Sequence, residues 1–323
     1  MRHLTLQALL ERRLVFVTGK GGVGKSAVAA ALARVAADRG KRVLVCEMDD
    51  KGSLATYLGR EQLGFEPVTV APNLAAMAMN TEDSLREYIR LYLRVPIIGS
   101  LAPLARIFDF VANAAPAVKE ILAIGKLCYE VRENNYDLVI ADSEASGHFV
   151  AQVSAPDALA ALVRIGIVAD QTKWMSNLLH DHSVSSVLAV VTPEEMPVVE
   201  TIELRERLAK ATPVNFAGVV INRMPAVVGV AVSGASSAAA TDASVSGASV
   251  SDETRAVVDW LTMRRTAAEG HARALADAFE LGNVETLSEA PAKGGDASAG
   301  NRAPTAIVAH LVGEINRVLS EHA

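Results

Sequence analysis

A glycine-rich octapeptide at residues 19–26, Gly-Lys-Gly-Gly-Val-Gly-Lys-Ser, constrains the fold more than any other part of the chain. It lies between an apolar run at residues 14–17 and an alanine-rich stretch at residues 27–38. A glycine, four residues and then Gly-Lys-Ser is the spacing of a phosphate-binding loop that joins a strand to a helix. Glycines let backbone N–H groups face phosphate oxygens, and the following helix directs its positive end at the same anion. We therefore predict a strand, a loop and a helix arranged around a phosphate chain.

The residues of this loop predict how a nucleotide would be held. Lys25 would reach the β- and γ-phosphates, and the Ser26 hydroxyl would ligate Mg²⁺. The loop residues that we predict to bind the nucleotide are Gly19, Lys20, Gly21, Gly22, Val23, Gly24, Lys25, Ser26 and Ala27.

Short apolar runs alternate with helical patterns along most of the chain. The runs are continuous in their apolar character, as expected of strands that are covered on both faces. We predict an α/β fold with a doubly wound, mostly parallel sheet, in a single domain over residues 1–323. The predicted strands cover residues 14–17, 43–47, 73–80, 138–142, 187–192, 219–222 and, at one edge, 284–287.

Two segments depart from this alternation. Residues 81–134 carry only helical patterns, and we predict that they form a helical insert subdomain. Within it, residues 97–111 are apolar almost all round, which fits either an exposed groove or packing inside the insert. Residues 226–251 are nearly all Ala, Ser, Gly and Val, and such a tract buries too little area to offset its ordering entropy. We predict a flexible loop there, and an apolar-faced helix at residues 305–319.

Composition excludes several classes of function. The net charge is −6 and no long basic run is present, which argues against a nucleic-acid partner. Cys46 and Cys128 are the only cysteines, and they form no C-x-x-C pair for zinc or an iron–sulfur cluster. The sequence has no secretory signal and no apolar stretch of the roughly 18 residues that a membrane span needs. We predict a cytoplasmic protein.

The second lysine of the loop, Lys20, resembles the signature of the deviant-Walker-A ATPases, which include ArsA/Get3, MinD, ParA and the nitrogenase iron protein. The resemblance implies that ATP and Mg²⁺ are the cofactors and that the active form is a dimer. In that dimer, Lys20 would reach the nucleotide of the facing subunit and act with Lys25 in catalysis.

Two further segments favour the ArsA/Get3 branch. Asp49-Asp50-Lys51-Gly52-Ser53-Leu54 resembles its first switch, Asp-Pro-Ala-His-(Ser/Asn)-Leu, in the first, fifth and sixth positions. Asp142-Ser143-Glu144-Ala145-Ser146-Gly147-His148 resembles its second switch, Asp-Thr-Ala-Pro-Thr-Gly-His.

The resemblance assigns a role to each matching residue. Asp49 would orient the attacking water, and Asp142 would hold Mg²⁺ through a water molecule. Gly147 would supply a backbone N–H to the γ-phosphate. Asn222 and Arg223 follow a late strand, where the family contacts the adenine edge of ATP.

The resemblance implies an ATP-hydrolysing switch that handles a hydrophobic protein or membrane partner. The dimer would be a homodimer or a heterodimer with a paralogous ATPase, without a Get3-type zinc clasp. Two alternatives stay open. The substitutions in both switches fit a regulatory, weakly hydrolysing subunit paired with a paralogue, and a ParA/MinD-like positioning ATPase uses the same loop.

Overall fold

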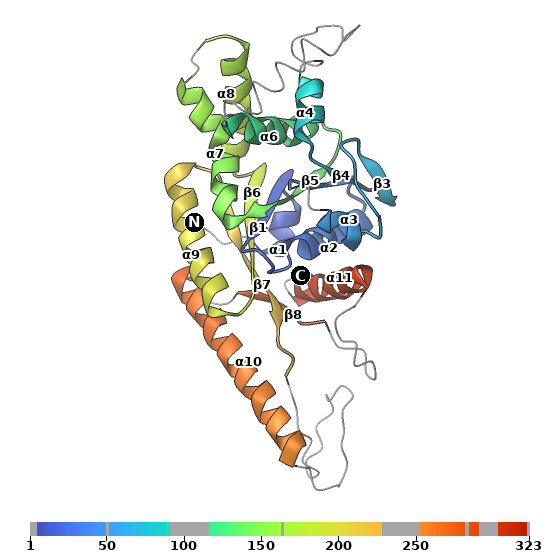
Figure 1. The fold of residues 1–323 in the computed structure, drawn as a ribbon, viewed down its shortest axis with the longest axis vertical. Coiled ribbons are helices and arrows are strands. Elements are labelled where there is room, and N and C mark those ends of the chain that lie inside the picture. Colours follow the sequence, from blue (N-terminus) through green and yellow to red (C-terminus); the bar gives the residue numbers. More distant parts are fainter. Residues whose placement is uncertain are drawn as a thin grey trace.

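The computed structural model describes residues 5–49, 52–88, 90, 116–162, 165–227, 252–281, 284–290 and 303–321. Its centre is an eight-stranded sheet in the order β3-β4-β2-β5-β1-β6-β7-β8 (Figure 1). The strands are β1 Leu14–Gly19, β2 Val43–Glu47, β3 Val68–Ala71, β4 Leu74–Ala78, β5 Leu138–Ala145, β6 Ser185–Val191, β7 Phe216–Met224 and β8 Glu285–Ser288. Neighbouring strands run parallel except β3 and β4. This arrangement confirms the predicted α/β fold.

Helices cover both faces of the sheet (Figure 1). They are α1 Leu6–Leu10, α2 Lys25–Asp38, α3 Ser53–Tyr57, α4 Thr81–Tyr88, α6 Pro116–Arg132, α7 Ser146–Leu162, α8 Ile167–His180, α9 Glu195–Ala211, α10 Asp252–Ala278 and α11 Pro304–Glu321. The predicted helices after the loop and near the end of the chain are therefore present as α2 and α11.

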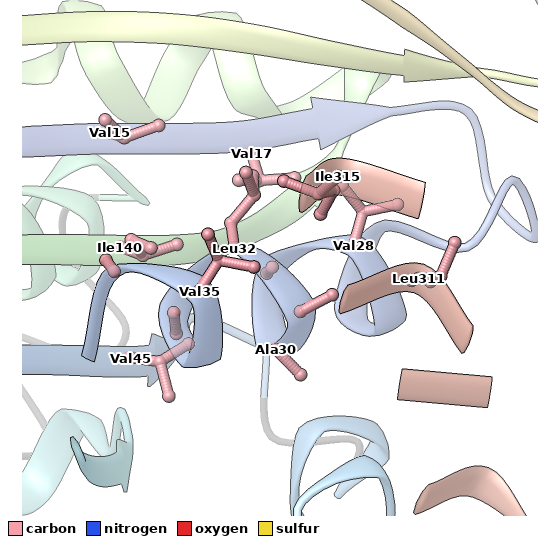
Figure 2. Packing of buried hydrophobic residues seen from close by; sticks show 14 of the residues in the cluster. Val15, Val17, Val28, Ala30, Leu32, Val35, Val45, Ile140, Leu311 and Ile315 are labelled. Carbon is pink, nitrogen blue, oxygen red and sulfur yellow. The ribbon is translucent and has the colours of Figure 1, made fainter. Parts of the chain in front are cut away.

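Helix α2 is alanine-rich because it is enclosed between the sheet and α11. Figure 2 shows Leu32 and Val35 of α2 beside the sheet residues Val17, Val45 and Ile140. On its other side, α2 packs against α11. Small side chains let the helix approach both neighbours closely, which fixes its first turn at the end of β1.

The opposite face of the sheet is covered by α6 to α10, which contribute residues to a second apolar core. In that core the rings of Phe16 from β1 and Phe149 from α7 lie with centroids 5.9 Å apart. Both cysteines are buried there, so burial raises the pKa of each thiol. Two separate cores on one sheet explain why its strands are apolar on both faces.

The helices of the predicted insert are held together by a buried ion pair. The Nζ atom of Lys126 in α6 lies 2.8 Å from a carboxylate oxygen of Glu87 in α4 and 2.8 Å from one of Glu130. The apolar segment at residues 97–111 lies outside the described residues, as does most of the predicted loop at residues 226–251. The division of the chain into one domain with a helical subdomain stays a prediction.

Several expectations need correction. Strand β5 continues to Ala145, three residues beyond the predicted end, because Gly19 pairs with Ala145 at its far end. The expected strand over residues 73–80 is shorter, Leu74–Ala78, and pairs with an unpredicted antiparallel edge strand, β3. Within the described ranges, no helix combines the length and apolar character that crossing a bilayer requires.

Candidate nucleotide-binding site

The glycine-rich loop lies at the carboxyl end of the central strand β1, between β5 and β6. Two of its glycines are required by close contacts. A Cβ atom on Gly19, whose φ is 146°, would lie 2.1 Å from the Val190 carbonyl oxygen. A Cβ atom on Gly24, whose φ is 93°, would lie 2.4 Å from the side-chain nitrogen of Asn222. The loop therefore sits tightly against β6 and β7, and only glycine fits at these two positions.

The amino end of α2 opens directly onto this loop. Gly24 is the N-cap residue, has a left-handed conformation and provides no side-chain cap for the first N–H groups of α2. Lys25 folds back over the loop, with its Nζ atom 3.4 Å from the Lys20 carbonyl oxygen. One point therefore faces unsatisfied N–H groups, the positive end of the helix dipole and an ammonium group. This arrangement favours the binding of an anion.

Two carboxylates close this point from the sheet side. Val43 and Val45 of β2 and Leu138 and Ile140 of β5 face α2, and the next alternate residue on each strand is acidic: Glu47 on β2 and Asp142 on β5. The two residues are paired in register on neighbouring strands. Both are buried, with exposed fractions of 1% and 2%. The sheet thus places two acids beside the first turn of α2.

Asp142 has the properties of a metal-site carboxylate. Both of its oxygens are buried without a hydrogen-bond partner of normal geometry in the described part of the chain, and the nearby Ser26 hydroxyl lies 3.0 Å from that of Ser53. Burial raises the pKa of Asp142 to about 7, against the influence of Ser26 and Lys25, which lower it. A buried carboxylate with unused oxygens beside a serine hydroxyl fits Mg²⁺, which prefers oxygen ligands and retained water.

Glu47 is a site residue that the sequence reasoning missed. Its Oε1 atom accepts hydrogen bonds from Ser53 N at 2.7 Å, Ser53 Oγ at 2.9 Å and Leu54 N at 3.3 Å. Its Oε2 atom is buried with no hydrogen-bond partner among the described residues, and burial raises the pKa of the group. An acid among the apolar residues of a core strand, at its carboxyl end, was the available signal.

Of the two segments that resemble switches, the first begins at Asp49, two residues after Glu47, and the second begins at Asp142 itself. Asp49 is half-buried just beyond β2, and its charge raises the pKa values of Glu47 and Asp142. Gly147 is exposed in the first turn of α7, where backbone N–H groups have no partner within the helix. Asp50 and Lys51 of the first switch lie outside the described residues.

Lys20 and Asn222 are both engaged within the chain. Lys20 Nζ lies 2.6 Å from Glu200 Oε1 of α9, and each side chain is about one-third exposed. Asn222 is buried, and its side-chain nitrogen donates to the Val23 carbonyl oxygen at 2.9 Å, which braces the loop. Arg223 is exposed. A cavity of about 80 Å³ opens between Gly24, Ala27, Asn222, Arg223 and residues of β8 and α11.

Among the described residues, no group of three or more His, Cys, Asp or Glu side chains is placed to hold a metal ion. The groups that would hold a magnesium ion at this site are Ser26, Asp142, the nucleotide phosphates and water. This mode of binding is usual for Mg²⁺ in phosphate-transfer sites.

Comparison with known proteins finds similarity over the part of the chain that carries this site. Residues 12–167 match the family model described as anion-transporting ATPase. ATPase BagA of Mycobacterium tuberculosis (strain ATCC 25618 / H37Rv) is 28% identical over 222 residues, which cover 65% of each chain. A putative arsenical pump-driving ATPase of Halobacterium salinarum is 28% identical over 66% of this chain and 35% of its own. ATPase get3 of Schizosaccharomyces japonicus is 31% identical over 48% of each chain.

Proposed function

We propose that this chain is an ArsA/Get3-like ATPase, which binds Mg²⁺ and ATP at residues 19–26 and hydrolyses ATP to ADP and phosphate. The chain spans 65% of the length of ATPase BagA, so its activity, substrates and partners are argued from its own residues. The observation that carries the proposal is the pair of unused Asp142 oxygens, buried beside Ser26 and the amino end of α2.

Each residue of the site has a defined task in this proposal. The loop N–H groups and Lys25 hold the β- and γ-phosphates and stabilise the charge that builds up on their oxygens. Ser26 and Asp142 would hold Mg²⁺, which supplies charge neutralisation at the same phosphates when bound. Asp49 accepts a hydrogen bond from the attacking water and aligns it with the γ-phosphate. The N–H of Gly147 donates to a γ-phosphate oxygen.

The cavity beside Gly24 and Asn222 would take the adenine ring. The cavity opens next to the loop, so an adenine ring in it would lie close to phosphates that the loop holds. One hydrogen of the Asn222 side-chain nitrogen is bound to Val23, so its carbonyl oxygen and its second N–H can face the edge of a base. Arg223 stands at the same opening.

The hydrolysis step is tested by Asp49→Asn. We expect turnover of ATP to fall about 100-fold, since the amide oxygen is uncharged and a weaker acceptor than the carboxylate for orienting the water. The affinity for ATP should stay the same, because the loop is intact. Phosphate release and calorimetric titration measure the two quantities. Asp38→Asn, an exposed residue paired with Arg34, is the matched control. Normal turnover in Asp49→Asn would remove this residue from the mechanism.

The dimer is part of the proposal, and the Lys20–Glu200 ion pair makes it testable. If Lys20 crosses to the nucleotide of a facing subunit, it must first leave Glu200. Glu200→Ala removes this competition in both subunits. Partly exposed pairs contribute up to about 1 kcal/mol each, so we expect the ATP-dependent dimer to tighten about tenfold.

Light scattering across a concentration series measures this dimer. Lys20→Ala should weaken it, while Glu203→Ala, an exposed change on the same helix, should leave it unaltered. A dimer that is indifferent to both Lys20→Ala and Glu200→Ala would contradict the role of this lysine. Whether the dimer is formed from identical chains or with a paralogue is decided by the partner that co-purifies in ATP.

The partner that the switch handles is proposed from the family. The resemblance to the ArsA/Get3 group implies a hydrophobic protein or a membrane partner rather than nucleic acid, and relatives of the chain are named arsenical pump-driving ATPase and ATPase get3. The second candidate is a regulatory, slowly hydrolysing subunit, which the replacements Asp50, Lys51 and Gly52 in the first switch favour. Turnover of the wild-type chain, alone and with a co-purified paralogue, separates the two.

A further inference from the structure

A chain of hydrogen bonds joins the phosphate loop to α3. The Ser26 hydroxyl lies 3.0 Å from the Ser53 hydroxyl, which in turn donates to Glu47 Oε1 at 2.9 Å. Ser53 N also donates to Glu47 Oε1, at 2.7 Å. Gly52, the N-cap residue of α3, has no side chain to cap the helix, so Glu47 serves as its acceptor from the neighbouring strand.

The direction of the hydrogen atoms in this chain follows from the acceptor at its end. An ionised carboxylate only accepts, and a serine hydroxyl carries one hydrogen. Since the Ser53 hydrogen goes to Glu47, Ser53 Oγ must accept from Ser26. The Ser26 hydrogen is therefore turned toward Ser53, and the lone pairs of Ser26 Oγ are left for a cation.

The second oxygen of Glu47 is also unused. Oε2 is buried with no hydrogen-bond partner among the described residues, and both Asp142 oxygens are in the same condition. The two acids are paired in register and face the same side of the sheet. Adjacent buried carboxylates with unused oxygens are costly unless a cation or its water shell lies between them.

We propose that Glu47 is a positioning residue of the magnesium site: through Ser53 it sets the direction of the Ser26 hydroxyl, and with its second oxygen it joins Asp142 in facing the water shell of Mg²⁺. This inference rests on the proposed function. The same carboxylate also accepts hydrogen bonds from the amino end of α3. Leu54 and Ala55 of α3 share a core with Leu311 and Ile315 of α11, so metal binding is linked to the packing of both helices.

The test measures Mn²⁺ binding to the protein–ADP complex by electron paramagnetic resonance, beside ADP binding in EDTA. Groups that orient metal ligands typically change metal affinity by 10- to 100-fold. We expect Glu47→Gln and Ser53→Ala each to weaken Mn²⁺ binding by about tenfold or more. Ser53→Thr keeps the hydroxyl and should restore wild-type Mn²⁺ affinity. ADP affinity in EDTA should be unchanged in all three variants.

Glu206→Gln, an exposed carboxylate on α9, is the charge-matched control and should behave as the wild type. Wild-type Mn²⁺ affinity in both Glu47→Gln and Ser53→Ala would overturn the inference. So would a loss in Ser53→Ala that Ser53→Thr fails to restore. If instead the wild-type chain binds no ADP in EDTA or with Mn²⁺, the proposed function itself fails, and that result is distinguishable from the others.

Discussion

Lys25→Ala is expected to abolish measurable ATP binding, with an affinity at least about 100-fold below that of the wild type. Hydrogen bonds to charged groups contribute about 1.5–3 kcal/mol each, and a factor of ten in affinity is about 1.4 kcal/mol. The ammonium group lies over the loop, 3.4 Å from the Lys20 carbonyl oxygen, where it would meet two phosphates at once. Calorimetric titration with ATP and Mg²⁺ measures the loss.

The matched control is Lys210→Ala, because that side chain is 79% exposed and lies 4.0 Å from Glu206. It should bind ATP as the wild type does. The melting temperature of both variants without nucleotide shows whether a loss of ATP binding comes from a loss of folding. Unchanged ATP affinity in Lys25→Ala would refute the assignment of residues 19–26 as the phosphate loop.

Asp142→Asn is expected to stabilise the metal-free protein at neutral pH while it removes the response to Mg²⁺. Burial raises the pKa of Asp142 from 3.8 to about 7, and the nearby charges of Glu47 and Asp49 add to the rise. The folded chain therefore holds a proton that the unfolded chain has lost between pH 4 and pH 7. Stability from this group falls as pH rises through that window and is constant above it.

The size of this effect follows from the shift of about three pKa units, which corresponds to about 4 kcal/mol at most. Relaxation around the charge reduces it, so we expect Asp142→Asn to exceed the wild type by about 2–4 kcal/mol at pH 8. At pH 4 the difference should be close to zero. Urea denaturation in EDTA at both pH values measures it, and a difference that is independent of pH would contradict the buried, ionisable state of Asp142.

Magnesium should reverse the order of stability, so that the wild type becomes more stable than Asp142→Asn. With ADP and Mg²⁺ present, the wild type gains the binding free energy of the complex, whereas Asp142→Asn lacks one of the groups that would hold the metal. The pKa of Asp142 should fall when Mg²⁺ is bound, because a nearby cation favours the ionised form. With Mg²⁺ bound, the stability of the wild type should no longer fall as the pH rises toward 7.

The central part of the fold could be predicted because its signals are local. The loop at residues 19–26 specifies a strand before it and a helix after it, and β1 and α2 occupy those positions. Asp142 and Asn222 lie at or near the carboxyl ends of core strands, so a parallel sheet brings them to the same edge. No knowledge of side-chain contacts was needed for these placements.

Other features depend on contacts between distant residues or on weak patterns. Strand β3 is short and partly exposed, so its composition does not mark it as a core strand. The available signal was Pro72-Asn73, a turn pair whose Asn has a φ of 58° and joins β3 to β4. The ion pair of Lys20 with Glu200 joins residues 180 positions apart, and no local pattern predicts it. Glu47 was overlooked because its neighbours predict only an apolar strand.

The most direct test of the account is a crystal structure of the chain with Mg²⁺ and a non-hydrolysable ATP analogue. We predict that the β- and γ-phosphates lie within the loop at residues 19–26, that Lys25 contacts both, and that the metal lies between Ser26 and Asp142. A nucleotide bound elsewhere, or a loop that stays empty at saturating analogue, would contradict the account.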